Sequence, residues 1–388
     1  MTERWERDLA RWQAAGLVDA ASVERIRAFE SGQDRARGLR WPVAIAVVLG
    51  AVLLGAGVLL FVAAHWDRLS PTVRFALALG QVAVFHLGGG IAAARFPLLA
   101  TALHAVGTVA LGAGVFLTGQ IFHLQAHWPG GLMLWAAGAW VAWALLRDGP
   151  QAAIAALLTP AWLAGEWIEL TGGLNAGGAH RVLPAAALLL VAIVYLTASG
   201  PERSTPARHA LAWIGGIALL PLAAQLPFVH AVFGRAEVSL QGWVPVAGWA
   251  VAFGMPLLLA WRLRGAAAWA HVLAAVWVLA LASTAWPDRE AGGALGLWGR
   301  WGPYLMWMAG AIALIAWGLA ERMRARINLG VAGFALTVLA YYFSTLMDML
   351  GRAASLVGLG LLFVAGGWLL ERMRRRLVDR LDARSAGS

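Results

Sequence analysis

Cysteine and lysine are absent from this chain, and charged residues are scarce, at 13% of 388 positions. Without cysteine the protein has no disulfides, no thiolate metal ligands and no cysteine nucleophile. Soluble proteins carry about 25% charged residues. The low share of charge, together with 61% hydrophobic residues, therefore predicts an all-α integral membrane protein.

Motifs for nucleotide chemistry and hydrolysis are also missing from the sequence. No glycine-rich phosphate loop, dinucleotide fingerprint, G-x-S-x-G elbow or H-E-x-x-H pair occurs. Nothing indicates energy coupling by ATP, and we expect no cofactor and no metal.

The sequence contains long stretches without a charged residue. A helix needs about 20 apolar residues to cross a bilayer, and each stretch reaches that length. They run between Arg40 and Asp67, Arg95 and Arg147, Arg208 and Arg235, Glu237 and Arg262, and Arg264 and Asp288.

The apolar stretches divide the chain into three predicted parts. Residues 1–38 are an N-terminal helical hairpin, residues 39–371 a polytopic transmembrane domain, and residues 372–388 an Arg-rich tail. About 12 transmembrane helices are expected, near 41–64, 72–94, 98–119, 129–147, 150–168, 182–199, 208–226, 243–261, 266–286, 303–320, 327–347 and 353–370. Breaks in these helices are considered at Pro160, Pro221, Pro245 and Pro256.

Similar segments suggest repeated two-helix hairpins within the transmembrane domain. "LGAVLLGAGVLLF" at 49–61 resembles "VGTVALGAGVFLT" at 106–118, and "GLAERMRAR" at 318–326 resembles "WLLERMRRR" at 368–376. Chance similarity between glycine- and leucine-rich spans is the alternative.

The arginines predict the orientation. With both termini in the cytoplasm, 23 of the 30 arginines fall in cytoplasmic segments and 7 outside, as the positive-inside rule requires. The net charge of +10 therefore reflects topology and not nucleic-acid binding, which needs a basic soluble face. The partner expected is the lipid bilayer, with anionic lipid at the clusters 321–326 and 371–376.

The N-terminal segment carries an apolar stripe. Trp5, Leu9 and Trp12 share a helix face, Gly16 ends that helix, and Asp19 can cap a second one. This hairpin docks on the protein itself, on the membrane surface or on a protein partner bound by residues 1–38.

Polar residues gather at the predicted outer helix ends. "FVAAHWDRLSPTVRF" (61–75) places such residues where the first span stops, although Trp66 as an interfacial anchor and Ser70-Pro71 as a helix start explain much of it. Interfacial hydrogen bonding, a substrate vestibule and a metal site sharing two histidines remain open as interpretations. The candidates are His65, Asp67, Gln120, His123, His127, Glu166 and Glu169.

Two further histidines lie within predicted spans. His86 is nine residues before Arg95 and His104 nine after it, so an antiparallel pair of helices places them at the same depth. They form an intramembrane polar pair, for which a structural hydrogen bond, a proton relay and haem ligation are considered.

Several of these segments resemble a known family. "WQAAGLVDAASVERIRAFE", "LFVAAHWDRLS", "GQIFHLQAHW", "PAWLAGEW" and "INLGVAGFALTVLAYYF" are similar to the uncharacterised bacterial multi-pass membrane proteins grouped as domain of unknown function 2157. The resemblance implies a bacterial cytoplasmic (inner) membrane protein. It implies no activity.

Three functions fit these observations. The first is a transporter, flippase or channel-like permease with an outward-facing polar vestibule. The second is a membrane-embedded enzyme acting on a lipid or lipid-linked substrate at the outer leaflet. The third is a non-catalytic scaffold or sensor.

Overall fold

The computed structural model describes residues 69–122, 127–173, 178–200, 205–229, 242–286 and 293–346, most of 9–26, and isolated positions in 46–60 and 360–372. All of the elements in this part of the chain are helical. Eight of these helical stretches are long and apolar enough to cross a membrane, by length and composition. The chain divides into two compact units, Met1–Glu166 and Trp167–Ser388.

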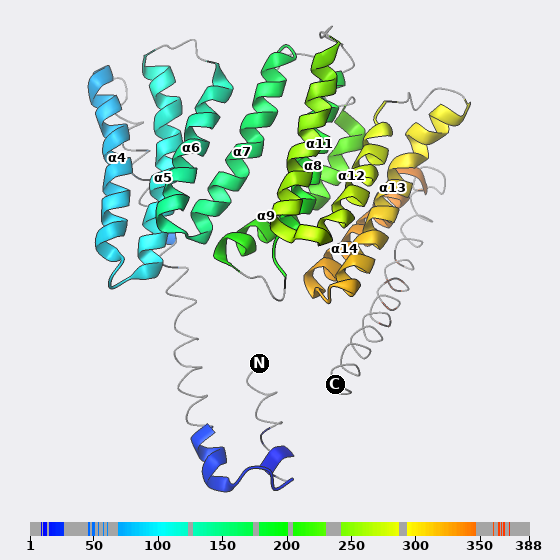
Figure 1. Cartoon of the computed structure of the whole chain (residues 1–388), viewed down its shortest axis with the longest axis horizontal. Helices are drawn as coiled ribbons and strands as arrows, with labels where there is room; N and C mark the ends of the chain where they lie inside the picture. The colour runs from blue at the N-terminus through cyan, green and yellow to red at the C-terminus, as the bar shows by residue number, and fades with distance from the viewer. Residues whose placement is uncertain are drawn as a thin grey trace. The chain divides into compact units, whose positions relative to one another are not determined.

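Unit 1 contains a row of apolar helices (Figure 1). Helix α4 packs along α5, and α5 packs against α6. Their bounds are α4 Pro71–Ala92, α5 Pro97–Ile121, α6 Trp128–Leu146 and α7 Gly149–Leu170, whose last residues belong to unit 2.

The helix start expected at Ser70 is present. The Ser70 side chain accepts a hydrogen bond from Val73 N at 3.4 Å, and Pro71 begins α4. The N-terminal turn also follows the sequence: Gly16 has a φ of 71°, and Asp19 Oδ1 accepts from Ser22 N at 3.2 Å. Gly16 ends the first helix because glycine tolerates a left-handed backbone. Asp19 caps the second because its carboxylate accepts a hydrogen bond from an otherwise unpaired N–H.

Unit 2 is organised around α8. Eleven of the 15 residues of α8 are buried, and α9, α11 and α12 pack against it. The bounds are η2 Gly178–Arg181, α8 Val182–Leu196, α9 Pro206–Gln225, η3 Leu226–Phe228, α11 Trp243–Arg264, η4 Gly265–Ala268, α12 Trp269–Ser283, α13 Gly293–Ala320, α14 Arg324–Tyr341 and the π-helical turn η5 Tyr342–Leu346.

Helix α8 differs from the span predicted at 182–199. Its 15 residues rise about 22 Å, which is less than the ~30 Å of a bilayer core. A helix that is apolar all round and buried on all sides belongs to a core. The neighbouring helices α9, α11 and α12 instead expose apolar side chains, as helices that face lipid do. Ile217, Leu258 and Val276 are 68%, 55% and 58% exposed.

The helix breaks considered at four prolines are absent from the helices that the structure describes. Pro160, Pro221 and Pro256 lie inside continuous helices, and Pro245 lies in the first turn of α11. Proline removes one backbone hydrogen bond, whereas ending a helix in hydrocarbon leaves several groups unpaired.

Other predictions remain open or need adjustment. Helix α13 begins at Gly293, where φ is 76°, and not near 303. The first and last predicted spans and the 49–61 repeat fall mostly outside the described residues, so the count of about 12 spans and the repeated hairpins stay predictions.

Candidate functional site

The polar pair predicted in unit 1 comes together in the structure. His86 on α4 and His104 on α5 approach with Nδ1 atoms 3.1 Å apart. The ring centroids are 5.3 Å apart at an interplanar angle of 34°. At this separation one ring donates its Nδ1 proton and the other accepts it.

Two glycines make room for the pair. A Cβ atom on Gly89 would lie 2.8 Å from the His104 ring, and one on Gly107 would lie 2.8 Å from the His86 ring. Each histidine therefore packs against a glycine of the opposite helix. The close approach of α4 and α5 at this level depends on both glycines.

A buried amide extends the polar region toward α7. Thr108 Oγ1 lies 2.8 Å from Gln151 Oε1 and 3.2 Å from the carbonyl oxygen of His104. Trp135 of α6 donates its indole N–H to the Thr108 carbonyl at 2.8 Å. Gln151 is fully buried and its Nε2 has no hydrogen-bond partner among the described residues. Three helices of unit 1, α4, α5 and α7, thus form one polar seam, which we call the histidine seam (His86, His104, Thr108 and Gln151).

Two vestibule candidates contact each other where α6 begins and α7 ends. His127 Nε2 lies 2.6 Å from Glu166 Oε2, and Trp162 donates to the other oxygen of Glu166 at 2.7 Å. The side chains of His127 and Glu166 are 51% and 37% exposed. The pair is therefore open to water or headgroups.

The vestibule formed with the remaining candidates stays a prediction. Gln120 is exposed in the last turn of α5, and Glu169 is partly buried in the last turn of α7. His65, Asp67 and His123 lie outside the described residues. Within the described part no group of three or more His, Asp or Glu side chains is arranged to hold a metal ion.

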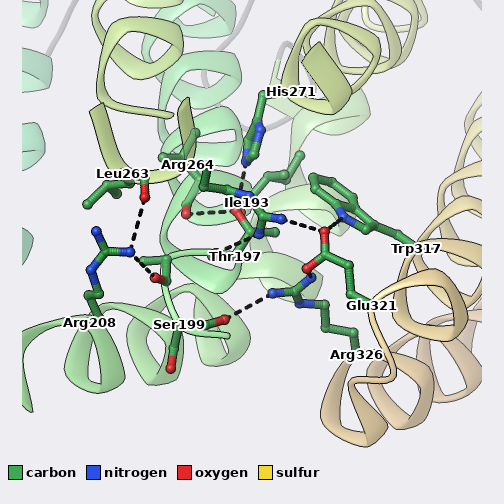
Figure 2. A network of polar contacts seen from close by, with 12 residues as sticks. Ile193, Thr197, Ser199, Arg208, Leu263, Arg264, His271, Trp317, Glu321 and Arg326 are labelled. Carbon is green, nitrogen blue, oxygen red and sulfur yellow. Dashed lines mark hydrogen bonds and ion pairs between the residues drawn. The ribbon is translucent and has the colours of Figure 1, made fainter. Parts of the chain in front are cut away.

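A second polar cluster, in unit 2, was not anticipated. Glu321, between α13 and α14, accepts from Arg264 Nη2 at 2.5 Å and from Arg326 Nη1 at 2.5 Å. Trp317 donates its indole N–H to Glu321 Oε1, also at 2.5 Å. Figure 2 shows the carboxylate between the two guanidinium groups.

The same arginines hold the end of α8. In each of the three residues directly after α8, the carbonyl oxygen accepts a hydrogen bond from a different arginine. Arg264 Nη1 donates to Thr197 at 2.8 Å, Arg208 Nη1 to Ala198 at 3.1 Å, and Arg326 Nη2 to Ser199 at 3.1 Å. Arg208 Nη1 also lies 3.1 Å from the Leu263 carbonyl of α11 (Figure 2).

A buried histidine borders this cluster. His271 of α12 is fully buried, and its Nε2 lies 2.7 Å from Thr197 Oγ1. The Trp317 ring meets the His271 ring edge-on, with centroids 5.1 Å apart. The Nδ1 atom of His271 has no hydrogen-bond partner in the part of the chain described.

The electrostatics of the cluster keep Glu321 ionised. Burial alone raises the pKa of Glu321, but hydrogen bonds from Trp317, Arg326 and Arg264 outweigh it, so the pKa lies below its ordinary value. Two cationic donors stabilise the carboxylate more than partial burial disfavours it.

This cluster leaves fewer arginines for the anionic-lipid site at residues 321–326, which stays a prediction. Arg326 is 1% exposed and pairs with Glu321, so only Arg322 and Arg324 remain to face a lipid headgroup there. His271 had a visible signal, because it lies in a charge-free run. Glu321 had none, since arginine-rich turns are common at cytoplasmic helix ends.

Comparison with known proteins supports the membrane assignment. A family model described as "Predicted membrane protein (DUF2157)" matches residues 10–152, which confirms the resemblance for that part of the chain. No curated protein and no solved structure matches. The chain is a membrane protein with several apolar helices, and the matched region includes the whole histidine seam.

Proposed function

We propose that the protein is a permease of the bacterial cytoplasmic membrane in which the histidine seam moves protons. One observation carries the proposal: a hydrogen-bonded imidazole pair lies within two adjacent helices of membrane-spanning length. Ionisable side chains in a membrane are costly and are usually retained for function.

The chemistry follows from the two Nδ1 atoms. In the neutral pair one ring carries the Nδ1 proton and the other accepts it. Transfer begins when the donating ring gains a proton at its Nε2. Its Nδ1 proton then passes to the Nδ1 of the second ring, which releases a proton from its own Nε2. One proton enters, one leaves, and both rings end with their tautomers exchanged.

The His127–Glu166 pair forms part of the outward vestibule in this proposal. An imidazole hydrogen-bonded to a carboxylate can bind a proton and pass it on. Both termini lie in the cytoplasm, as the arginine distribution favours.

Water access to the seam tests the proposal first. The chain lacks cysteine, so a single cysteine in place of His104 can be probed with a small membrane-impermeant thiol reagent. The reagent is applied to right-side-out and to inside-out vesicles. We expect labelling from at least one side, because a relay needs water at its ends.

Leu87→Cys is the matched control, next to His86 but 67% exposed on the outer surface of the helix. In hydrocarbon it stays unlabelled. If His104→Cys reacts no faster than Leu87→Cys from either side, the proposal fails.

A lipid-modifying enzyme is the second candidate, favoured by the exposed His127–Glu166 contact at 2.6 Å. An imidazole held by a carboxylate is suited to general acid–base chemistry. The test compares lipid extracts, by mass spectrometry, from membranes containing the wild type or Glu166→Gln. A lipid species altered by the wild type alone supports the enzyme, and identical lipid profiles in both membranes reject it.

A further inference from the structure

The arginine cluster of unit 2 joins turns that are far apart in the sequence. Arg208 lies in the first turn of α9, Arg264 ends α11, and Arg326 lies in the first turn of α14. All three donate to the carbonyl oxygens of residues 197–199, directly after α8. One end of the core helix is therefore tied to three surrounding helices by arginine side chains (Figure 2).

Among the described residues of this cluster, Glu321 supplies the one full negative charge that faces the arginines. Three guanidinium groups face one carboxylate and the helix C-terminus, which supplies about half a negative charge. Glu321 bridges Arg264 and Arg326. If its charge is lost, no other described residue places an anion between these two cations, since the nearby titratable group, His271 of α12, is another base.

Glu321 lies in a turn beside a left-handed residue and is less buried than its partner Arg326. Arg322, the next residue, has a φ of 55°, which non-glycine residues rarely adopt. The side chain of Glu321 is 25% exposed, so water reaches it. By contrast, Arg326 is 1% exposed and is fixed to two partners.

We propose that Glu321 closes an ionic latch, formed with Arg208, Arg264 and Arg326 over residues 197–199, and that breaking its ion pairs opens this end of unit 2 to water. The latch is a conformational device that ties helix ends, and opening it exposes the backbone after α8. It lies entirely in unit 2, so it stands or falls independently of the histidine seam.

A pair of single-cysteine variants tests the latch in the full-length protein. Ala198→Cys places a thiol under the latch, where the native side chain is 2% exposed. Ala186→Cys places one in α8 itself, at a position that is fully buried and lies away from the latch. Each is combined with Glu321→Gln, which removes the charge with little change in shape, and is labelled at pH 7 with a small water-soluble maleimide.

We expect Glu321→Gln to speed labelling of the thiol at position 198 at least about tenfold more than labelling of the thiol at position 186. An equal increase at both positions would show that Glu321 braces the whole fold, which overturns the latch. Unchanged labelling at both would show that the ion pairs do not control access, which overturns it equally.

Discussion

At the residue scale, the histidine seam depends on the missing side chains of Gly89 and Gly107. His86 and His104 meet because each ring lies against a glycine of the opposite helix. Packing of small residues is what lets transmembrane helices approach closely, since lipid removes the hydrophobic drive for association. The pair is therefore sensitive to a single methyl group.

Gly89→Ala and Gly107→Ala should each destabilise the protein by about 1–3 kcal/mol, the usual cost of overpacking a tight contact. The added Cβ would overlap His104 or His86. Thermal unfolding in detergent measures the effect. Gly90→Ala is the matched control, because a Cβ there meets nothing within 4 Å. Equal melting temperatures for Gly89→Ala and Gly90→Ala would contradict this packing.

Thr108→Val should destabilise the protein by about 1–3 kcal/mol, because it leaves the buried Gln151 amide without its hydroxyl partner. The indole bond from Trp135 goes to the Thr108 backbone and is unaffected. Adding Gln151→Leu should recover most of the loss, since removing both polar partners is nearly neutral. Strictly additive losses, measured by thermal unfolding, would argue against the Thr108–Gln151 contact.

At the element scale, α8 decides the arrangement of unit 2. It is too short to cross a bilayer alone and is buried on most of its surface. Length and apolarity in the sequence predict a span there, but neither property separates a core helix from a lipid-facing one. Only the burial of α8 among α9, α11 and α12 makes that distinction.

The crossing of α8 and α9 should be the least tolerant point of unit 2. A Cβ on Gly215 would overlap the backbone of Leu196 and Ala192, which cannot move aside. Gly215→Ala should therefore cost about 3 kcal/mol or prevent folding. Gly216→Ala, whose Cβ would meet a Leu196 methyl at 3.7 Å, should fold normally. Size-exclusion profiles and melting temperatures of the two variants test this, and similar stability in both would refute the crossing.

At the scale of the whole molecule, the sequence predicted contacts between consecutive helices but not contacts between helices far apart in the chain. Counting from Arg95 placed His86 and His104 together, because a short turn fixes the register of two antiparallel helices. The Glu321 cluster could not be predicted in the same way. Its bond to Arg264 joins residues 57 positions apart, and the sequence alone does not say which helices are neighbours.

The Glu321 ion pairs should make stability depend on acid. The pKa of Glu321 is lower in the folded protein than its ordinary value, so its contribution is complete above the ordinary carboxyl range. It is lost progressively as the pH falls below that range. The melting temperature of the wild type should exceed that of Glu321→Gln at pH 7, and the gap should narrow toward a pH of about 3.5. A gap that stays constant across this range would contradict the ion pairs.

Proton flux through the histidine seam tests the central claim most directly. Purified protein is reconstituted in liposomes that contain a pH-sensitive dye, and a potassium diffusion potential with valinomycin drives protons inward. We predict flux above that of protein-free liposomes, reduced about tenfold or more by His86→Gln and by His104→Gln and retained in Gly90→Ala. Wild-type flux no greater than that of empty liposomes, or undiminished flux in both histidine variants, would contradict the account.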